Sequence, residues 1–335
     1  MKVVCTAHAM TAPAPQEGAD GSHEARFRAM GSDAHFIVVG PDAGLLDRAR
    51  ARIDELEQRW SRFIDTSEIC EINRRSGAAV AVSADTVLLV ERAIEAWRLT
   101  GGGFDPTVLG DVIRAGYDRS FDELDPVVRP VSSELGRGCA DIVVRGSEVR
   151  LPAGVGFDPG GIGKGLAADL VVAEVMAAGA EGVCVNLGGD LRVSGRSPVG
   201  GSWTIAIEHD LAIEPVVFVA LTEGAVATST TLRRRWSVDG RPRHHLIDPW
   251  TGEPSVSDLT LVAVVAREAW IAEVLAKAEL LRGSARAFDL VGGTGAEALA
   301  VTVAGKLLAT DGFRKFVGEA GVADRIELMA EEDRP

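Results

Sequence analysis

Short apolar segments, separated by turns of only a few residues, restrict the folds available to the second half of this chain. The sequence predicts strands around 183–187, 190–194, 202–208, 216–222 and 260–266. Parallel neighbours need a crossover of about a dozen residues or more, whereas antiparallel neighbours need only a short turn. The sheets are therefore expected to be largely antiparallel and packed against helices, which is the α+β class.

Helices are predicted on both sides of these strands. Apolar residues recur at helical spacing from Leu45 to Trp60, which predicts an amphipathic helix over residues 43–60. A second helix is expected over about 84–99, ending at a run of three glycines. A third is expected to run from a glycine-rich segment to about Ala178, and a fourth over about 268–282.

Two further segments read as strands. Residues 26–39 form a first strand region, and the runs 141–145 and 148–151 flank Gly146-Ser147 as a hairpin. The chain of 335 residues is long enough to bury a large core. We expect a disordered arm over residues 1–24, a single domain over 25–320, and a frayed acidic tail over 321–335.

The net charge of −14 excludes nonspecific nucleic-acid binding, which needs a basic surface. An acidic protein that binds a diphosphate must neutralise it locally, by a cation, by backbone amides or by a few basic side chains. The four cysteines are widely spaced, so a reduced compartment is the simpler interpretation. The first residues lack an apolar core of a signal peptide, and no long uncharged apolar stretch occurs. The expectation is a cytoplasmic protein without a membrane span.

The segment Asp158-Pro-Gly-Gly-Ile-Gly-Lys-Gly-Leu-Ala-Ala-Asp169 places four glycines and Lys164 where a loop becomes a helix. Glycine lets the backbone approach a bulky anion, and a helix start offers unpaired N–H groups. This chemistry suits a phosphate or a diphosphate. The segment fits neither the Walker A pattern nor the dinucleotide-binding glycine pattern. Without a second motif, a tight strand-to-helix turn explains it equally well.

A second motif is His244-His245-Leu-Ile-Asp248-Pro-Trp-Thr-Gly252. An imidazole near neutrality can take a proton from an alcohol, and a nearby carboxylate can orient it. The alternative is a simple turn in which Asp248 bonds its own backbone. On the residues alone the turn is the favoured interpretation, and His244 is expected to be an exposed neighbour of His245.

These motifs occur together with Gly101-Gly-Gly-Phe-Asp-Pro-Thr-Val108, Asn186-Leu-Gly-Gly-Asp190 and Thr228-Ser229. In this order, from about Met30 to Gly283, they resemble the flavin transferases of the ApbE type. The resemblance implies a T-fold-like architecture. It also implies an enzyme that cuts FAD, attaches FMN to a Ser or Thr hydroxyl of an acceptor flavoprotein, and releases AMP.

The resemblance also assigns roles to individual residues. It makes His245 and Asp248 the catalytic pair and gives Lys164 a contact with the diphosphate. The other cofactor-binding positions that it implies are Met30, Phe63, Gly103, Phe104, Asp105, Thr107, Gly160, Leu166, Ser229, Ile247 and Lys277. An aromatic such as Phe63 is more often a core residue, so its stacking on the flavin depends on the resemblance alone.

The chain departs from the family at the expected magnesium site. The family has an acid and, four residues later, a threonine on one helix, with a backbone carbonyl at the position of Gly163. Here these two positions are Glu273 and Lys277. Glutamate is a plausible ligand, but a protonated lysine is not. The pair also fits an ordinary helical ion pair of about 0.3–0.5 kcal/mol. Mg²⁺ at Gly163 and Glu273 is therefore expected, with Lys277 either repelling it or taking over part of its charge.

A second departure is Thr230-Thr231, where the family has a glycine and an acid. Arg233-Arg234-Arg235 follows and can hold a phosphate, although an arginine run is more often a solvated face. Two alternatives to transfer therefore stay open. One is an FAD-binding protein without catalysis, and the other is an FAD pyrophosphatase that releases FMN and AMP.

Overall fold

The computed structural model describes residues 4–5, 16–17, 21–128, 132–317 and 326–328. Within these ranges the largest unit is a sheet with the strand order β19-β18-β17-β16-β13-β10-β9-β4-β3-β2. All of its neighbours are antiparallel except β18 and β19. Its strands are β2 (Gln16–Glu17), β3 (Ser22–Ala29), β4 (Ser32–Val39), β9 (Gly182–Leu187), β10 (Asp190–Gly195), β13 (Gly224–Thr230), β16 (Leu259–Ala266), β17 (Glu297–Thr302), β18 (Leu307–Ala309) and β19 (Ile326–Leu328).

Both faces of this sheet are covered, and the alternation of side chains shows it. In β4, Phe36 and Val38 belong to one buried cluster, whereas Ile37 and Val39 belong to another on the opposite face. Every residue of β16 is buried. A strand covered on both sides needs apolar residues at consecutive positions, which explains the apolar run over 261–266.

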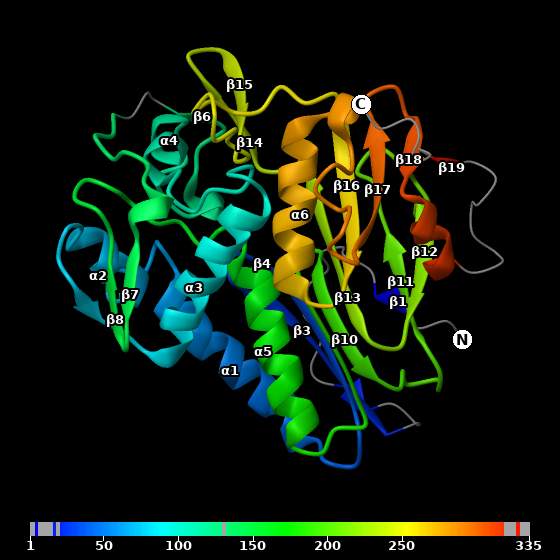
Figure 1. Ribbon diagram of the computed structural model, residues 1–335. Helices are drawn as coiled ribbons and strands as arrows, with labels where there is room; N and C mark the ends of the chain where they lie inside the picture. Colours follow the sequence, from blue (N-terminus) through cyan, green and yellow to red (C-terminus); the bar gives the residue numbers. More distant parts are fainter. Residues whose placement is uncertain (1–3, 6–15, 18–20, 129–131, 318–325, 329–335) are drawn as a thin grey trace.

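Helices cover one face of the sheet, as Figure 1 shows. They are α1 (Gly44–Trp60), α3 (Ala84–Leu99), α5 (Gly163–Ala177) and α6 (Ala269–Arg282), with the shorter α2 (Glu68–Arg74) and α4 (Leu109–Arg114) beside them. Helix α5 packs on β9 and β10, and α6 packs on β13 and β16. The two helices also pack against each other. A Cβ on Gly165 would lie 2.5 Å from the carbonyl oxygen of Ala269, so only glycine permits this close approach.

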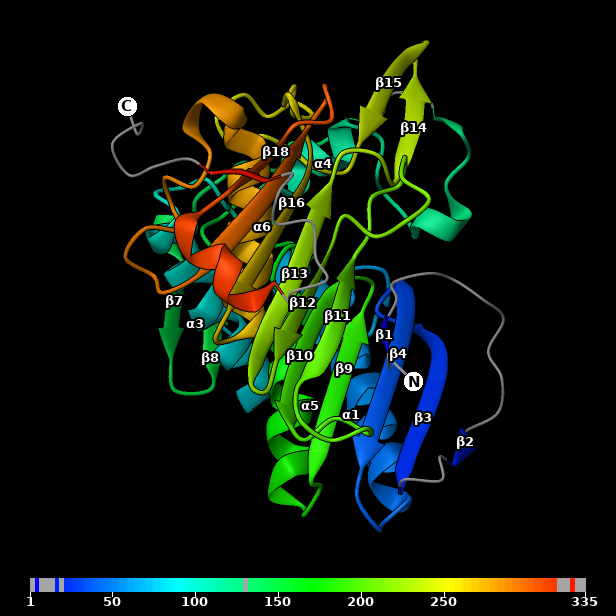
Figure 2. The ribbon, with the colours of Figure 1, turned by 90° about the vertical axis from the view of Figure 1, so that its right-hand side faces the viewer.

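Smaller sheets complete the molecule. On the other face of the main sheet, β11 (Trp203–Ile207) and β12 (Val217–Leu221) form a sheet with β1 (Val4–Cys5), and the 3-10 segment η4 (Asp311–Phe316) lies beside β12 (Figure 2). The other two are β15-β14-β6 and β5-β8-β7. Their strands are β5 (Val80–Ala81), β6 (Val127–Val128), β7 (Val143–Arg145), β8 (Glu148–Arg150), β14 (Arg235–Val238) and β15 (Arg241–His244).

The α+β class with largely antiparallel sheets is confirmed. Each predicted long helix is present within a few residues of its expected range. Strands β13, β14, β15, β17 and β18 were not predicted, because their short or polar sequences give little periodic signal. Most of the predicted arm and tail lies outside the described residues. Their described parts, including the start of β3 at Ser22, are paired strands.

Candidate functional site

A cavity of about 340 Å³ opens where turns, loops and helix faces from distant parts of the chain meet. Residues 112–122 and Arg234 contribute to its lining, together with six other segments. These six are the β3–β4 turn at Met30 and Gly31, residues 57–64 at the end of α1, the loop at 103–108, the glycine-rich loop at 158–164, the segment 245–249 and the face of α6 at Lys277. The resemblance had assigned site residues in all six segments, and the structure brings them to one place.

The glycine-rich loop is fixed by its own aspartate. The backbone N–H of Asp158 donates to the carbonyl of Pro106 at 2.7 Å, which joins this loop to the loop at 103–108. Its Oδ1 accepts the N–H of Gly160 at 2.8 Å. A Cβ on Gly161 would lie 2.5 Å from Lys277 Nζ and 2.7 Å from a ring carbon of Phe104. Glycine is therefore required here by two cavity side chains.

Three basic side chains line the cavity beside His245. Lys164 is bonded to Asp190 and lies 3.7 Å from Glu273, and burial lowers its pKa to about 8. Lys277 Nζ donates to the carbonyl of Gly160 at 3.2 Å. Arg234 donates to the carbonyl of Gly31 at 2.9 Å. An acidic molecule thus concentrates positive charge at one cavity, as an anionic ligand requires.

The imidazole of His245 is neutral near pH 7. Burial lowers its pKa well below the usual 6.5, and the nearby charges of Arg234 and Lys277 lower it further. Its Nδ1 is buried and has no hydrogen-bond partner among the described residues. His245 lines the cavity, and a neutral imidazole there is suited to accept a proton from a hydroxyl group.

The neighbouring residues of this segment have structural contacts. The expectation that His244 is exposed is wrong. Its ring lies 3.0 Å from the carbonyl of Ser255 and accepts the N–H of Leu246, so it holds the end of β15 in place. Asp248 Oδ1 accepts the N–H of Trp250 at 2.8 Å, which is the turn contact considered as the alternative. The cavity lining does not include Asp248.

An aromatic wall forms one side of the cavity. The guanidinium group of Arg62 lies over two neighbouring rings, 4.1 Å from the centre of Phe63 and 4.5 Å from that of Tyr117. It also forms an ion pair with Asp158 at 3.5 Å. Phe63 is 39% exposed, which is unusual for a large apolar ring in a core. Such a surface suits a planar ring system, which stacks on aromatic faces.

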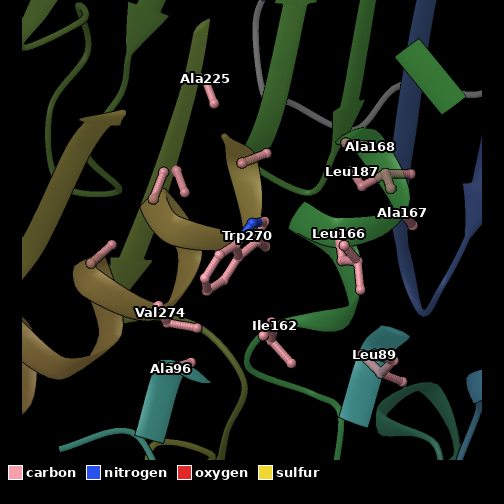
Figure 3. Close-up of a cluster of buried hydrophobic side chains, with 14 of the residues drawn as sticks. Leu89, Ala96, Ile162, Leu166, Ala167, Ala168, Leu187, Ala225, Trp270 and Val274 are labelled. Carbon is pink, nitrogen blue, oxygen red and sulfur yellow. The ribbon is translucent and has the colours of Figure 1, made fainter. Parts of the chain in front are cut away.

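Four further predicted residues lie outside the cavity lining, and Glu273 is one of them. Thr107 is fully buried, and its hydroxyl donates to Asp105, so it orients that cavity residue. Leu166 packs in a buried cluster with Ile162 and Trp270, as Figure 3 shows. Ser229 is buried on β13, the strand on which α6 packs. The predicted residues that do line the cavity are Met30, Phe63, Gly103, Phe104, Asp105, Gly160, Gly163, Lys164, His245, Ile247 and Lys277.

The residues at the expected magnesium site do not fit that ion. Glu273 is buried, and its Oε2 already accepts the N–H of Gly165 at 2.8 Å while Oε1 faces Lys164. One helical turn further on, Lys277 presents an ammonium group, which repels a cation. Among the described residues, no cluster of three His, Cys, Asp or Glu side chains could hold a metal.

Several residues that build the cavity give little signal in the sequence. Arg62 and Tyr117 were not singled out, although they build the aromatic wall. Arg234 was noted only within an arginine run, and Asp190 only within a motif. The one signal in the sequence was that Arg62 stands next to Phe63. The contacts themselves join residues far apart in the chain, so no local pattern reveals them.

Comparisons with known proteins agree on one family. The model of the ApbE family matches residues 30–300. An FAD:protein FMN transferase of Vibrio cholerae is 29% identical over 80% of this chain and 80% of its own. One of Klebsiella pneumoniae is 31% identical over 71% of this chain and 76% of its own. The crystal structure of the ApbE protein of Thermotoga maritima superposes with a TM-score of 0.79 at 25% identity, covering 89% of this chain and all of that one (100%).

Proposed function

The chain belongs to the ApbE family, and from this premise we propose that it is an FAD:protein FMN transferase. Relatives with that activity match most of its length. FAD is the substrate, and the acceptor is a flavoprotein that offers a Ser or Thr hydroxyl. The products are AMP and an acceptor that carries FMN in a phosphodiester link.

The cavity supplies binding and charge for this reaction. The aromatic wall at Phe63 and Tyr117 offers a stacking surface for the isoalloxazine ring. The glycine-rich loop lets the diphosphate approach the backbone, and Lys164 contributes positive charge at the start of α5. Phosphoryl transfer needs positioning and charge stabilisation more than covalent help from the enzyme.

Proton transfer is assigned to His245. The acceptor hydroxyl oxygen attacks the phosphorus of the FMN half, its proton passes to the imidazole, and the bond between phosphorus and the bridging oxygen breaks. The bridging oxygen keeps the electron pair of that bond and leaves as part of AMP. Asp248 belonged to the predicted catalytic pair, and its turn contact with Trp250 supports a role in shaping the loop that carries His245.

One observation carries the proposal. A neutral histidine lines the same cavity as Lys164, Lys277, Arg234 and an aromatic wall. This arrangement provides a general base and a diphosphate-binding site in one cavity. Catalysis requires both, whereas binding alone does not require the base. The two alternatives, an FAD-binding protein without catalysis and an FAD pyrophosphatase, are not favoured.

No step is assigned to magnesium, because the donor set at Glu273 and Lys277 does not suit it. Among the described residues, the helices are too short or too polar to cross a bilayer. A cytoplasmic location stays a prediction, as does the class of acceptor beyond a flavoprotein with a hydroxyl.

The test is incubation of the purified protein with FAD and a flavoprotein acceptor, with and without Mg²⁺, while AMP release and acceptor mass are followed. Acceptor-dependent AMP and an FMN-sized mass gain are expected. AMP without a labelled acceptor would indicate hydrolysis instead. Tight FAD binding with no AMP, across several acceptors, would refute the catalytic function.

A further inference from the structure

Four basic side chains line the cavity, and they differ in how their charge is balanced. Arg62 is paired with Asp158, and Lys164 is paired with Asp190. Lys277 and Arg234 form no ion pair with any carboxylate of the described residues. Each donates instead to a neutral backbone carbonyl. Glu273 and Asp158 attract Lys277 only from beyond ion-pair distance, so two positive charges face the cavity without a carboxylate in direct contact.

Such an arrangement is costly unless a ligand uses it. Removing a cation from water without an anionic partner is unfavourable, and burial accordingly lowers the pKa of Lys277. Arg234 is also held in the left-handed region, with φ of 49°, which non-glycine residues rarely adopt. Strain of this kind concentrates at functional sites.

Both cations are held in position by distant parts of the fold. Lys277 reaches from α6 to the glycine-rich loop, where Gly161 leaves the space that its ammonium group occupies. Arg234 reaches the β3–β4 turn at Gly31. They converge on the two loops that border the region where a diphosphate would lie beside Lys164.

With Lys277 one helical turn away, Glu273 is not suited to recruit a metal ion that would balance a diphosphate. One of its oxygens accepts a backbone N–H, and the other faces Lys164. A divalent cation added beside it would stand near two ammonium groups, those of Lys164 and Lys277, and like charges repel.

We propose that Lys277, together with Arg234, binds the diphosphate of FAD in place of a divalent cation. This inference rests on the proposed function and specifies how its substrate is held. A diphosphate diester carries two negative charges, which the two unpaired side chains match. Both remain in place as the FMN–AMP bond breaks, so they also stabilise the charge on the departing AMP phosphate.

The first experiment measures FAD binding by fluorescence titration in the presence of EDTA and again with excess Mg²⁺. The wild type is expected to bind FAD equally well in both. Lys277→Met, which keeps the aliphatic stem but removes the charge, should bind FAD about tenfold to a hundredfold more weakly. Lys315→Met, at an exposed lysine of η4, is the matched control and should bind as the wild type does.

The second experiment measures metal binding directly, by calorimetric titration of chelator-treated protein with Mg²⁺ and Mn²⁺. The wild type should show no binding at micromolar concentrations. Lys277→Thr removes the ammonium group and adds an oxygen donor one turn from Glu273. FAD binding to this variant should therefore become stronger when Mg²⁺ is added. If Lys277→Met folds poorly, FAD binding by Lys277→Thr in EDTA can be compared with that of the wild type instead.

The outcomes separate the two proposals. Loss of wild-type FAD binding in EDTA, or micromolar Mg²⁺ binding by the wild type, would overturn the inference while FMN transfer still stands. Metal-independent FAD binding without any transfer would overturn the proposed function and leave the inference intact. If FAD binds neither in EDTA nor in excess Mg²⁺, the inference and the proposed function are both refuted.

Discussion

Single residues in this cavity take their chemical state from their surroundings rather than from their type. His245 and Lys164 both have lowered pKa values, in each case mainly because of burial. The result is a neutral base beside cations, which suits the removal of a proton from a hydroxyl group and the binding of a diphosphate. Three predictions test this description at the residue scale.

Replacing His245 with glutamine should abolish the proton acceptor while preserving the shape of the cavity. General base catalysis contributes about 10²–10⁴ in rate, so kcat for AMP release should fall by that factor. The dissociation constant of FAD should change little. His209→Gln is the control, because His209 bonds Thr260 and does not line the cavity. A kcat within tenfold of the wild type in His245→Gln would exclude this base.

The pH dependence follows from the same two groups. His245 becomes protonated only well below pH 6.5, so activity should hold between about pH 6.5 and 7.5. Lys164 loses its positive charge as the pH rises through about 8, so kcat/KM for FAD should decline above that value. In Lys164→Arg the guanidinium stays protonated, and the plateau should extend to higher pH. An alkaline decline unchanged in this variant would assign the titration to another group.

Gly161→Ala tests how closely the cavity is built. The added Cβ would lie 2.5 Å from Lys277 Nζ and 2.7 Å from Phe104, so the lysine must move away from the glycine-rich loop. FAD affinity should fall about tenfold, as measured by fluorescence titration. Gly136→Ala is the matched control, since the nearest atom to its Cβ is 3.9 Å away. Equal affinities in the two variants would argue against a fixed position for Lys277.

At the scale of elements, α6 is the support of the site, and carboxylates hold both of its ends. Asp169 of α5 accepts the N–H groups of Ala269 and Trp270 at the first turn. Near the other end, Glu279 accepts those of Phe288 and Leu290 in the following segment. Because the orientation of α6 decides where Lys277 reaches, these contacts link the stability of the helix to the site.

Asp169→Ala should therefore lower the stability of the fold and weaken the binding of FAD at the site. Two N–H groups at the start of α6 would lose their acceptors, which costs about 1–3 kcal/mol of unfolding free energy. The melting temperature should fall, and FAD binding should weaken with it. Glu91→Ala, at an exposed carboxylate of α3, serves as the control and should melt as the wild type does. Equal melting temperatures for the two variants would contradict a capping role.

At the scale of the whole molecule, the ten-stranded sheet brings together segments that are distant in the sequence. Strand β4 pairs with β9, and β13 lies between β10 and β16. One sheet therefore joins the hairpin β3–β4 to the strands β13 and β16, on which α6 packs. The cavity lies where these parts meet. A ligand bound there contacts both halves of the chain and stabilises the fold as a unit.

FAD should accordingly raise the melting temperature. A ligand at a hundred times its dissociation constant adds about 2.7 kcal/mol to the stability of the folded state. This corresponds to a shift of several degrees in differential scanning fluorimetry. AMP alone and FMN alone should each give smaller shifts, because each fills part of the cavity. No shift with FAD would contradict binding at this site.

The sequence by itself determined the local features of this protein. Helical spacing predicted α1, glycine runs indicated the end of α3 and the start of α5, short turns required antiparallel pairing, and the glycine-rich loop and His245 marked two parts of the site. These properties depend on neighbouring residues, which a sequence displays directly. The order of the motifs along the chain indicated the family.

Only the tertiary structure decided which side chains face the cavity and what balances their charge. Lys277 contacts Gly160 across 117 positions, and Arg234 contacts Gly31 across 203. His244 and Leu166 are buried, whereas Phe63 is exposed at the aromatic wall. Exposure, pairing and pKa depend on groups brought close by folding, so the misfit of magnesium with Lys277 became a structural conclusion only when both lysines were seen beside Glu273.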